Sequence, residues 1–362
     1  MKVLVAMSGG VDSSVAAYLL KKQGHDVTGL SFELWDKRDL KSSAVCCSVE
    51  TIELARSVAH SLGIEHHTVD VRDAFYRCVI EDFCTSYIKG ETPNPCILCN
   101  KYIKFNFLLK KAIELGADAV ATGHYARIEK FVGATLCGCP VDNGRYLLKK
   151  GIDLKKDQSY VLYVMKQDEL AKTLFPLGEL TKEKTREIAK ELGLATALRP
   201  ESQEICFVGD ENYTDFIRSF SPESLKPGPI VNMEGKVIGE HKGIAFYTIG
   251  QRKRLGISSP KPHFVAHIDR KKNIITVGSQ EDAMMKSFSV KDLNWIAIDG
   301  LSGSMKVKTK IRSMMKEAPA NISPLEDKRI LVEFDSPQWA PAPGQSAVFY
   351  DGDIVIGGGV IE

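Results

Sequence analysis

The chain lacks a strong charge of either sign and lacks any long apolar run. Its 362 residues carry 48 Lys and Arg against 46 Asp and Glu, a net charge of +2, so a nucleic-acid partner has to be sought in local patches. No apolar run approaches the roughly 18 residues of a membrane-spanning helix. No basic segment followed by an apolar one opens the chain. We therefore expect a cytoplasmic protein without a membrane partner.

A disulfide framework is also missing. The nine cysteines are an odd number without secretory context, so they are better interpreted as thiols, metal ligands or catalytic groups. The Cys-x-Cys spacing near residue 138 is not the Cys-x-x-Cys of a zinc knuckle. Three pairs have expected positions: Cys46 and Cys47 at the start of a helix, Cys78 and Cys84 buried in a helix, and Cys137 and Cys139 on the surface.

A glycine turn lies close to the start of the chain. Residues 2–18 are KVLVAMSGGVDSSVAAY, which predicts a short strand, a turn at 8–10 and a helix from about Ser13. The glycines let backbone amides approach an anion, and the hydroxyls of Ser8, Ser13 and Ser14 add donors at the positive end of the helix dipole. These features predict a phosphate-binding turn. It is not a Walker A loop, because no Gly-Lys-Ser/Thr follows.

Strands and helices alternate through the first part of the chain, and short strands with glycine turns follow Pro227. This order predicts an α/β fold, with a doubly wound nucleotide-binding domain over 1–210, a small central β domain over 211–280 and a C-terminal β-barrel over 281–362. Further expected elements are a strand over 117–129 that ends at the polar cluster 122–125, a hairpin over 130–150 turned at 142–144, helices over 155–180 and 181–197, and a strand over 244–257.

A second group of reactive residues surrounds two cysteines. Residues 90–101 (GETPNPCILCNK) bring Cys96 and Cys99 to a helix N-terminus, after two prolines that stiffen the approach. This position favours the thiolate, which is a nucleophile or a metal ligand. Phe32, near the end of the strand over 25–34, lies where a doubly wound sheet accommodates an adenine, and an ordinary core role suits it equally.

Eight motifs occur in order along the chain: SGGVDSS at 8–14, GETPNPCILCN at 90–100, ATGHYAR at 121–127, KDQSYVLY at 156–163, ICF at 205–207, GEHKG at 239–243, TIGQRKRLGI at 248–257 and PGQSAVFYDG at 343–352. Together they resemble the bacterial tRNA-specific 2-thiouridylases of the PP-loop ATP pyrophosphatase superfamily. The resemblance covers essentially the whole chain and implies the three domains described above. It implies ATP and Mg²⁺ as cofactors.

The same resemblance implies a reaction and partners. The carbon-2 oxygen of the wobble uridine (position 34) is adenylated and replaced by sulfur, with release of AMP and pyrophosphate. The implied substrate is a tRNA of the Lys, Glu or Gln type. The implied sulfur source is an upstream sulfur-relay protein or a cysteine desulfurase.

The resemblance also assigns roles to single residues. Cys99 matches the catalytic cysteine, Cys206 matches the cysteine that receives a persulfide sulfur, and Asp12 would help hold Mg²⁺. The implied ATP contacts are Ala6, Met7, Ser8, Gly9, Gly10, Val11, Asp12, Ser13, Phe32 and Gly123. The implied tRNA contacts are Asn94, Pro95, Cys96, His124, Lys156, Asp157, Gln158, Lys310, Ile311 and Gln345. Family members often carry Arg-Tyr in place of Lys310 and Ile311.

Basic residues near the C-terminus indicate how tRNA could be held. In SMKVKTKIR, Lys306, Lys308, Lys310 and Arg312 alternate with mostly apolar partners, so on a strand all four would project from one face toward phosphates. Residues 252–254 (Arg-Lys-Arg) form a second basic cluster. Either cluster is also compatible with an ordinary solvated surface.

Cys96 departs from the family pattern, which has Asp three residues before the catalytic cysteine. Cys96, Cys99 and Cys206 therefore form a candidate three-thiolate set, similar to related tRNA thiolation enzymes that hold a 4Fe-4S cluster. A zinc site and a redox dithiol are alternatives that the spacing does not separate. We favour the cluster, because an isolated thiol beside a reactive cysteine risks an unproductive disulfide.

Two other functions compete with tRNA thiolation. One is another PP-loop ligase or amidotransferase, which would need neither the cysteine set nor two β modules. The other is a non-catalytic tRNA-binding protein with a relict nucleotide fold. The intact SGGVDS turn together with Cys99 and Cys206 argues against this second alternative.

Overall fold

The structure of the chain is a computed structural model, and it describes residues 1–35, 49–131, 135–136, 139–140, 144–197, 205–208, 213–222 and 225–362. The predictions for Cys46, Cys47 and Cys137, and for the turn residues Asp142 and Asn143, lie outside the described residues. Within the described ranges, no helix combines the length and apolar character needed to span a membrane.

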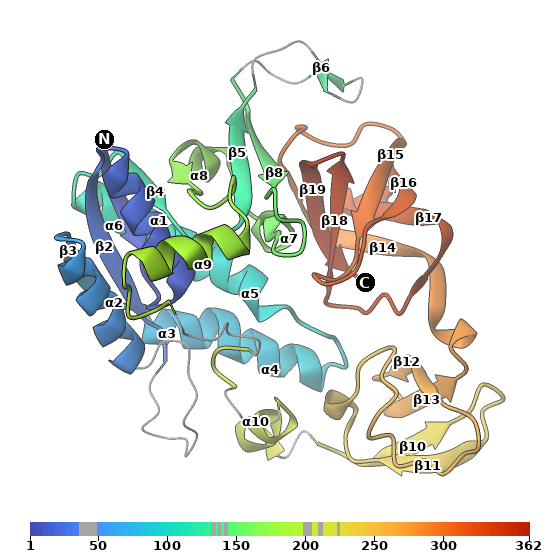
Figure 1. Ribbon diagram of the computed structural model, residues 1–362. Coiled ribbons are helices and arrows are strands. Elements are labelled where there is room, and N and C mark those ends of the chain that lie inside the picture. The colour runs from blue at the N-terminus through green and yellow to red at the C-terminus, as the bar shows by residue number, and fades with distance from the viewer. Residues whose placement is uncertain are drawn as a thin grey trace.

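A five-stranded parallel sheet forms the N-terminal part, in the order β3-β2-β1-β4-β9 (Figure 1). Its strands are β1 (Lys2–Ala6), β2 (Asp26–Glu33), β3 (Glu65–Asp70), β4 (Ala119–Ala121) and β9 (Thr173–Leu174). The α-helices of the described residues are α1 (Val11–Lys22), α2 (Val49–Ser61), α3 (Arg72–Phe75), α4 (Glu81–Ile88), α5 (Pro95–Leu98), α6 (Phe105–Glu114), α7 (Ser159–Leu162), α8 (Gln167–Ala171), α9 (Lys182–Glu191) and α10 (Tyr213–Phe220). The strand order reverses between β1 and β4, as in a doubly wound sheet.

The central strand β1 is apolar because helices cover both of its faces. Val3 and Val5 pack with residues of α1, α2 and α9. Leu4 points to the other face and packs with residues of α3, α4 and α6. A parallel strand buried on both sides carries no polar alternation. A ligand can therefore approach this sheet only at the ends of its strands.

Two helical runs contain π-helical turns. The first run joins α3, η2 (Tyr76–Ile80) and α4, and the second joins α5, η3 (Cys99–Lys104) and α6. The second run begins at Pro95, whose fixed φ suits the first helical position. Cys99 thus opens the π-turn, one turn inside the helix rather than at its very end. π-turns commonly mark functional sites.

Two predicted segments of the first domain divide differently. The predicted strand over 117–129 is two strands, because the chain turns at 122–125: β4 stays in the parallel sheet, and β5 (Ala126–Lys130) belongs to a second sheet. The predicted helix over 155–180 contains α7, α8 and the strand β9, which pairs with β4. A two-residue strand has too little periodicity to be predicted. The helix predicted over 181–197 is present as α9.

The central part has a four-stranded sheet of β11 (Val237–His241), β10 (Gly228–Val231), β13 (Ile274–Gly278) and β12 (Phe264–Asp269). The strand predicted over 244–257 is wrong. Residues 244–246 form a 3-10 turn, η5 (Ile244–Phe246), and positive φ values at Gly250 (86°) and Arg254 (65°) are incompatible with a strand. Ile244, Tyr247, Ile249 and Leu255 pack their side chains against the small sheet instead.

The C-terminal part is a closed barrel of β14 (Met284–Trp295), β17 (Ile330–Trp339), β16 (Ala318–Pro324), β15 (Met305–Lys310), β18 (Ser346–Asp351) and β19 (Ile354–Ile361). Antiparallel pairing of β14 with β19 closes it, which confirms the predicted barrel. Phe288, Val332 and Phe349 belong to its apolar core. Closure removes the unpaired edges that an open sheet would expose.

The predicted hairpin joins the first domain to the barrel (Figure 1). β5 pairs antiparallel with β8 (Tyr146–Lys150), and β6 (Thr135–Leu136) with β7 (Cys139–Pro140). β8 also pairs with β19 at Lys149 and Ile354. Arg127 of β5 donates a hydrogen bond to Asp353 at 2.6 Å. The barrel is therefore held against the nucleotide-binding domain through a continuous sheet.

Candidate nucleotide and thiol site

A pocket of about 220 Å³ lies at the carboxyl ends of β1 and β2, beside the point where the strand order reverses. Open α/β sheets bind ligands at this point. Among the predicted ATP contacts, Ala6, Met7, Ser8, Asp12, Ser13, Phe32 and Gly123 line the pocket. Gly9 and Gly10 lie in the turn between β1 and α1, and Val11 is the first residue of α1; none of the three lines the pocket.

The turn that follows β1 is shaped by its own hydroxyls. Ser13 Oγ donates to the Gly10 carbonyl at 3.1 Å and accepts from the Ser8 amide at 3.2 Å. Ser14 Oγ donates to the same carbonyl at 2.9 Å. The protons of Ser13 and Ser14 are therefore committed to the loop, contrary to the prediction that they face an anion. Their role in this structure is to hold the turn in shape.

Two glycines allow close packing around the turn. Gly9 has a φ of 70°, and a side chain there would collide with the carbonyl of Thr51. A side chain at Gly123 would lie 2.7 Å from the Ser13 amide nitrogen. Gly123 thus lets the segment after β4 lie directly against the first turn of α1. The floor of the pocket depends on this approach.

An ion pair links Asp12 to Lys182, a residue that sequence reasoning missed. Lys182 Nζ lies 2.7 Å from each carboxylate oxygen of Asp12, and the hydroxyl of Tyr125 donates to Oδ1 at 2.9 Å. Burial and the charge of Asp12 raise the pKa of Tyr125, so its hydroxyl stays protonated and can donate. The two partners are 170 positions apart, and only the fold brings them together.

Lys104 and His124 line the pocket on the side of the helix that carries Cys99. His124 is buried between Phe105 and Phe175, and its Nδ1 lies 2.6 Å from Thr122 Oγ1. Burial, followed by the charge of Lys104, lowers the pKa of His124 well below its usual value. His124 is therefore neutral and faces the pocket, although a tRNA contact was predicted for it.

A hydrogen-bond chain supports the strand end from behind. Ser31 Oγ lies 2.6 Å from the Met7 carbonyl and 2.9 Å from His66 Nε2. A carbonyl can only accept, so Ser31 donates to Met7 and His66 carries its proton on Nε2. Burial is the main cause that lowers the pKa of His66. Neighbouring Phe32 both lines the pocket and joins the core, so its core role is confirmed and its adenine contact stays a prediction.

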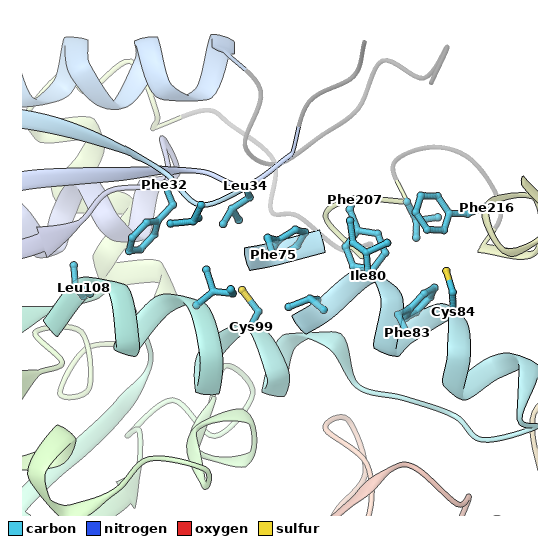
Figure 2. Close-up of a cluster of buried hydrophobic side chains, with 14 of the residues drawn as sticks. Phe32, Leu34, Phe75, Ile80, Phe83, Cys84, Cys99, Leu108, Phe207 and Phe216 are labelled. Atoms are coloured by element: carbon cyan, nitrogen blue, oxygen red, sulfur yellow. The ribbon is translucent and has the colours of Figure 1, made fainter. Parts of the chain in front are cut away.

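Cys99 is buried in an apolar cluster between the sheet and the helices (Figure 2). Figure 2 shows it between Phe32 of β2 and Phe207, with Phe75 close by. Cys206, beside the buried Phe207, packs against the same cluster. The fold thus brings the two predicted sulfur-handling cysteines to one apolar region. Cys84 is buried there as predicted, and burial raises its pKa to about 12.

Cys96 differs from Cys99 in its surroundings, since it is exposed on α5 whereas Cys99 is buried one turn later. Within the part of the chain that the structure describes, no three His, Cys, Asp or Glu side chains are grouped to hold a metal. Cys96, Cys99 and Cys206 therefore do not fit a preformed three-thiolate site. The iron-sulfur hypothesis gains no geometric support from these residues.

The loop before α5 is anchored to the barrel. The Thr92 amide donates to the Pro343 carbonyl at 2.7 Å, and the Gln345 side-chain amide donates to the Thr92 carbonyl at 2.9 Å. The next residues, Asn94 and Pro95, begin the helical run that carries Cys99. The barrel thereby sets the position of the reactive helix.

Comparisons with known proteins match this architecture along the whole chain. Three family models match, described as a tRNA methyl transferase HUP domain (residues 1–210), a tRNA methyl transferase PRC-barrel domain (214–279) and an aminomethyltransferase beta-barrel domain (285–361). The tRNA-specific 2-thiouridylase MnmA 2 of Caldanaerobacter subterraneus subsp. tengcongensis is 50% identical over 100% of this chain and 98% of its own length. The tRNA-specific 2-thiouridylase MnmA of Clostridioides difficile is 48% identical over the same shares. The chain belongs to the tRNA-specific 2-thiouridylase family.

Several of the residues predicted to contact RNA in this 2-thiouridylase family member form hydrogen bonds within the protein or are buried. Asp157 accepts from the amides of Gly151 and Ser159, and Gln158 accepts from the amide of Tyr125 at 3.0 Å. Other positions among them are the partly exposed Asn94 and Lys156, the buried Pro95 and Ile311, and the half-buried Lys310. Ile311 lies in the barrel core, so its side chain is not available to RNA.

The basic residues of 306–312 in this 2-thiouridylase differ in how exposed their side chains are. Lys306 and Lys308 are exposed on β15, as predicted. Lys310 is half-buried near the ring of Tyr160, and burial lowers its pKa. Arg312 lies beyond the strand and donates to the carbonyls of Ile249 and Ala340. Its predicted phosphate contact is wrong, because its guanidinium joins the central part to the barrel.

Proposed function

We propose that this chain is an ATP-dependent tRNA-uridine 2-sulfurtransferase that thiolates the wobble uridine, position 34. The proposal rests on one arrangement: the turn after β1 opens into a pocket that Lys104 also lines, and Lys104 ends the π-turn that Cys99 begins. One helical run therefore connects the pocket, where ATP would activate the base, with Cys99, which would take part in sulfur transfer. The near-half identity with curated 2-thiouridylases supports this assignment.

ATP and Mg²⁺ fit the residues present. Backbone amides at the start of α1 suit phosphate oxygens, and Asp12 offers carboxylate oxygens of the type that Mg²⁺ prefers. Mg²⁺ supplies charge neutralisation on the phosphates when bound. Phe32 would lie against the adenine, and Gly123 would border the nucleotide. Attack of the uracil carbon-2 oxygen on the α-phosphorus would release pyrophosphate and leave an adenylated base, from which AMP is a good leaving group.

Cys206 and Cys99 would then transfer sulfur. A relay protein or cysteine desulfurase would supply the outer sulfur of a Cys206 persulfide, and this sulfur attacks carbon 2 and expels AMP. The Cys99 thiolate attacks the Cys206 sulfur, which leaves 2-thiouridine and a Cys99–Cys206 disulfide. An external thiol must reduce this disulfide before the next turnover. The shared apolar cluster supports the pairing, because it buries Cys99 and also packs against the partly buried Cys206.

Cys96 separates the persulfide route from the iron-sulfur route. In the persulfide route Cys96 is a bystander, whereas a three-thiolate cluster would lose a ligand with it. Under anaerobic conditions, with tRNA, ATP, Mg²⁺ and a persulfide donor, we expect Cys96→Asp to form 2-thiouridine at the parent rate without bound iron. If the parent protein contains iron and Cys96→Asp loses both the iron and the activity, the result would favour the cluster.

Pyrophosphate release tests the function as a whole. Cys99→Ala and Cys206→Ala should abolish 2-thiouridine, while Cys206→Ala retains tRNA-dependent pyrophosphate release because adenylation precedes sulfur transfer. Cys78→Ala is the matched control, since Cys78 borders the same cluster and should not affect thiolation. Pyrophosphate release that does not depend on tRNA would indicate another PP-loop ligase. Its complete absence from the parent would indicate a non-catalytic RNA-binding protein.

A further inference from the structure

Lys182 occupies a position that is unfavourable for a cation. It is the first residue of α9, where the helix dipole favours an anion, and its side chain is only 9% exposed. Its backbone amide donates to Asp153 at 3.0 Å, which fixes the residue in place. A buried ammonium group requires an anionic partner. In this structure Asp12 is such a partner.

Lys182 contacts the same Asp12 carboxylate that is proposed to hold Mg²⁺. Both oxygens of Asp12 lie 2.7 Å from Lys182 Nζ, and Oδ1 also accepts from Tyr125. A divalent cation binds carboxylate oxygens directly, so its arrival at Asp12 must displace Lys182 from at least one of them. The displaced ammonium stays close to Asp12, which lines the pocket, because the Lys182 backbone is held by Asp153.

We infer that Lys182 exchanges partners during the reaction: it neutralises Asp12 before nucleotide binding and binds the pyrophosphate part of ATP once Mg²⁺ has taken its place. This inference rests on the assignment of ATP to the pocket. Charge supports it, because the exchange leaves both Asp12 and the phosphates neutralised. In the second position Lys182 stabilises the negative charge that develops on the leaving pyrophosphate.

Tyr125 keeps the carboxylate in place while the lysine moves. Its hydroxyl lies 2.9 Å from Asp12 Oδ1 and 3.0 Å from Thr185 Oγ1. Thr185 donates its own proton to the Thr181 carbonyl at 3.1 Å, so it can only accept from Tyr125. The single tyrosine proton can serve only one of these two oxygens at a time, and the charged carboxylate is the stronger acceptor. Asp12 therefore keeps the contact with Tyr125 after Lys182 has left.

Binding measurements on Lys182→Met test the exchange without relying on turnover. The probes are Mn²⁺ alone, followed by electron paramagnetic resonance, and pyrophosphate with Mg²⁺, followed by calorimetry. We expect Lys182→Met to bind Mn²⁺ at least tenfold more tightly than the parent and Mg²⁺-pyrophosphate at least tenfold more weakly. Lys184→Met is the matched control, because Lys184 is exposed on the same helix and pairs with Glu187. It should match the parent in both measurements.

Asp12→Asn provides an independent arm in case Lys182→Met does not fold. Removal of the carboxylate charge leaves Lys182 without its ion pair, so metal-free pyrophosphate should bind at least threefold more tightly than to the parent. Unchanged pyrophosphate affinity in Lys182→Met, or no gain in Asp12→Asn, would overturn the inference. A parent protein that binds neither ATP nor pyrophosphate would instead refute the nucleotide assignment itself.

Discussion

Gln345 of the barrel and Thr92 of the first domain are joined directly, through a hydrogen bond of 2.9 Å from the glutamine amide to the threonine carbonyl. Between the two segments, Gly344 has a φ of 87°, and a side chain there would lie 3.0 Å from the Thr92 amide. Thr92 leads into the helical run that carries Cys99. A change in the barrel is therefore transmitted to the reactive thiol through one short loop.

Replacement of Gln345 by Leu should loosen this loop in the protein without RNA. The variant loses one hydrogen-bond donor and should lose about 1–2 kcal/mol of unfolding free energy. Hydrogen exchange at residues 90–95 should accelerate, thiolation should slow, and ATP affinity should be unchanged. Gln338→Leu is the control, because the Gln338 side-chain amide donates to a nearby carbonyl in sequence, that of Ser336. If hydrogen exchange at residues 90–95 is unaltered in Gln345→Leu, Gln345 does not hold this loop, and its predicted contact with tRNA would be its remaining role.

Lys306 and Lys308 should contribute to tRNA binding through phosphates. Loss of two phosphate contacts lowers the slope of log affinity against log salt by roughly 1.4–1.8. We expect Lys306→Ala with Lys308→Ala to show this change in a binding titration over several salt concentrations, with unchanged ATP affinity. Arg312→Ala offers a contrast: it should lower the thermal stability and keep the salt slope. A constant slope in the double variant would make β15 an ordinary solvated surface.

Local patterns were predictable from the sequence where a short segment determines its own geometry. The strand, glycine turn and helix over 2–18 need no distant partner, and the alternation along the barrel strands reports a sheet with one buried face. The predicted phosphate contact of Arg312 was wrong for a related reason. The alternation continued past Lys310, but the strand ends there, and the pattern could not show that the arginine turns toward two carbonyls of other segments.

Contacts between distant segments could not be predicted. Lys182 carries no motif, and it reaches Asp12 only because α9 packs against α1 in the apolar cluster below the sheet. Cys99 is likewise buried in a cluster that also contains Phe207, which follows Cys206 much later in the chain. Sequence spacing therefore identified the reactive residue types, whereas their charge partners and their exposure required the fold.

The pH dependence of stability should reflect His124. Burial lowers its pKa in the folded state, so below a pH of about 6.5 the unfolded chain binds a proton that the folded chain excludes. The contribution of His124 is fully present above that pH and is lost as the pH falls, at no more than about 1.4 kcal/mol per pH unit. Urea unfolding at pH 7.5 and 5.5 should show a smaller difference in His124→Asn than in the parent. His60→Asn, at an exposed position, should keep the parent difference, and an equal difference in all three proteins would contradict this assignment.

Gly123 should tolerate no side chain, although it does not need an unusual backbone conformation. A methyl group there would lie 2.7 Å from both the Asp12 carbonyl carbon and the Ser13 amide nitrogen, so Gly123→Ala must push the first turn of α1 away from β4. Overpacking of this kind costs about 1–3 kcal/mol, and here it also displaces the amides proposed to bind phosphate. We expect ATP affinity in calorimetry to fall at least tenfold, with a moderate loss of thermal stability. Gly300→Ala is the control, because a methyl group there would meet no atom within 4 Å. Parent-like ATP affinity in Gly123→Ala would show that the nucleotide does not depend on the contact between the segment after β4 and the start of α1.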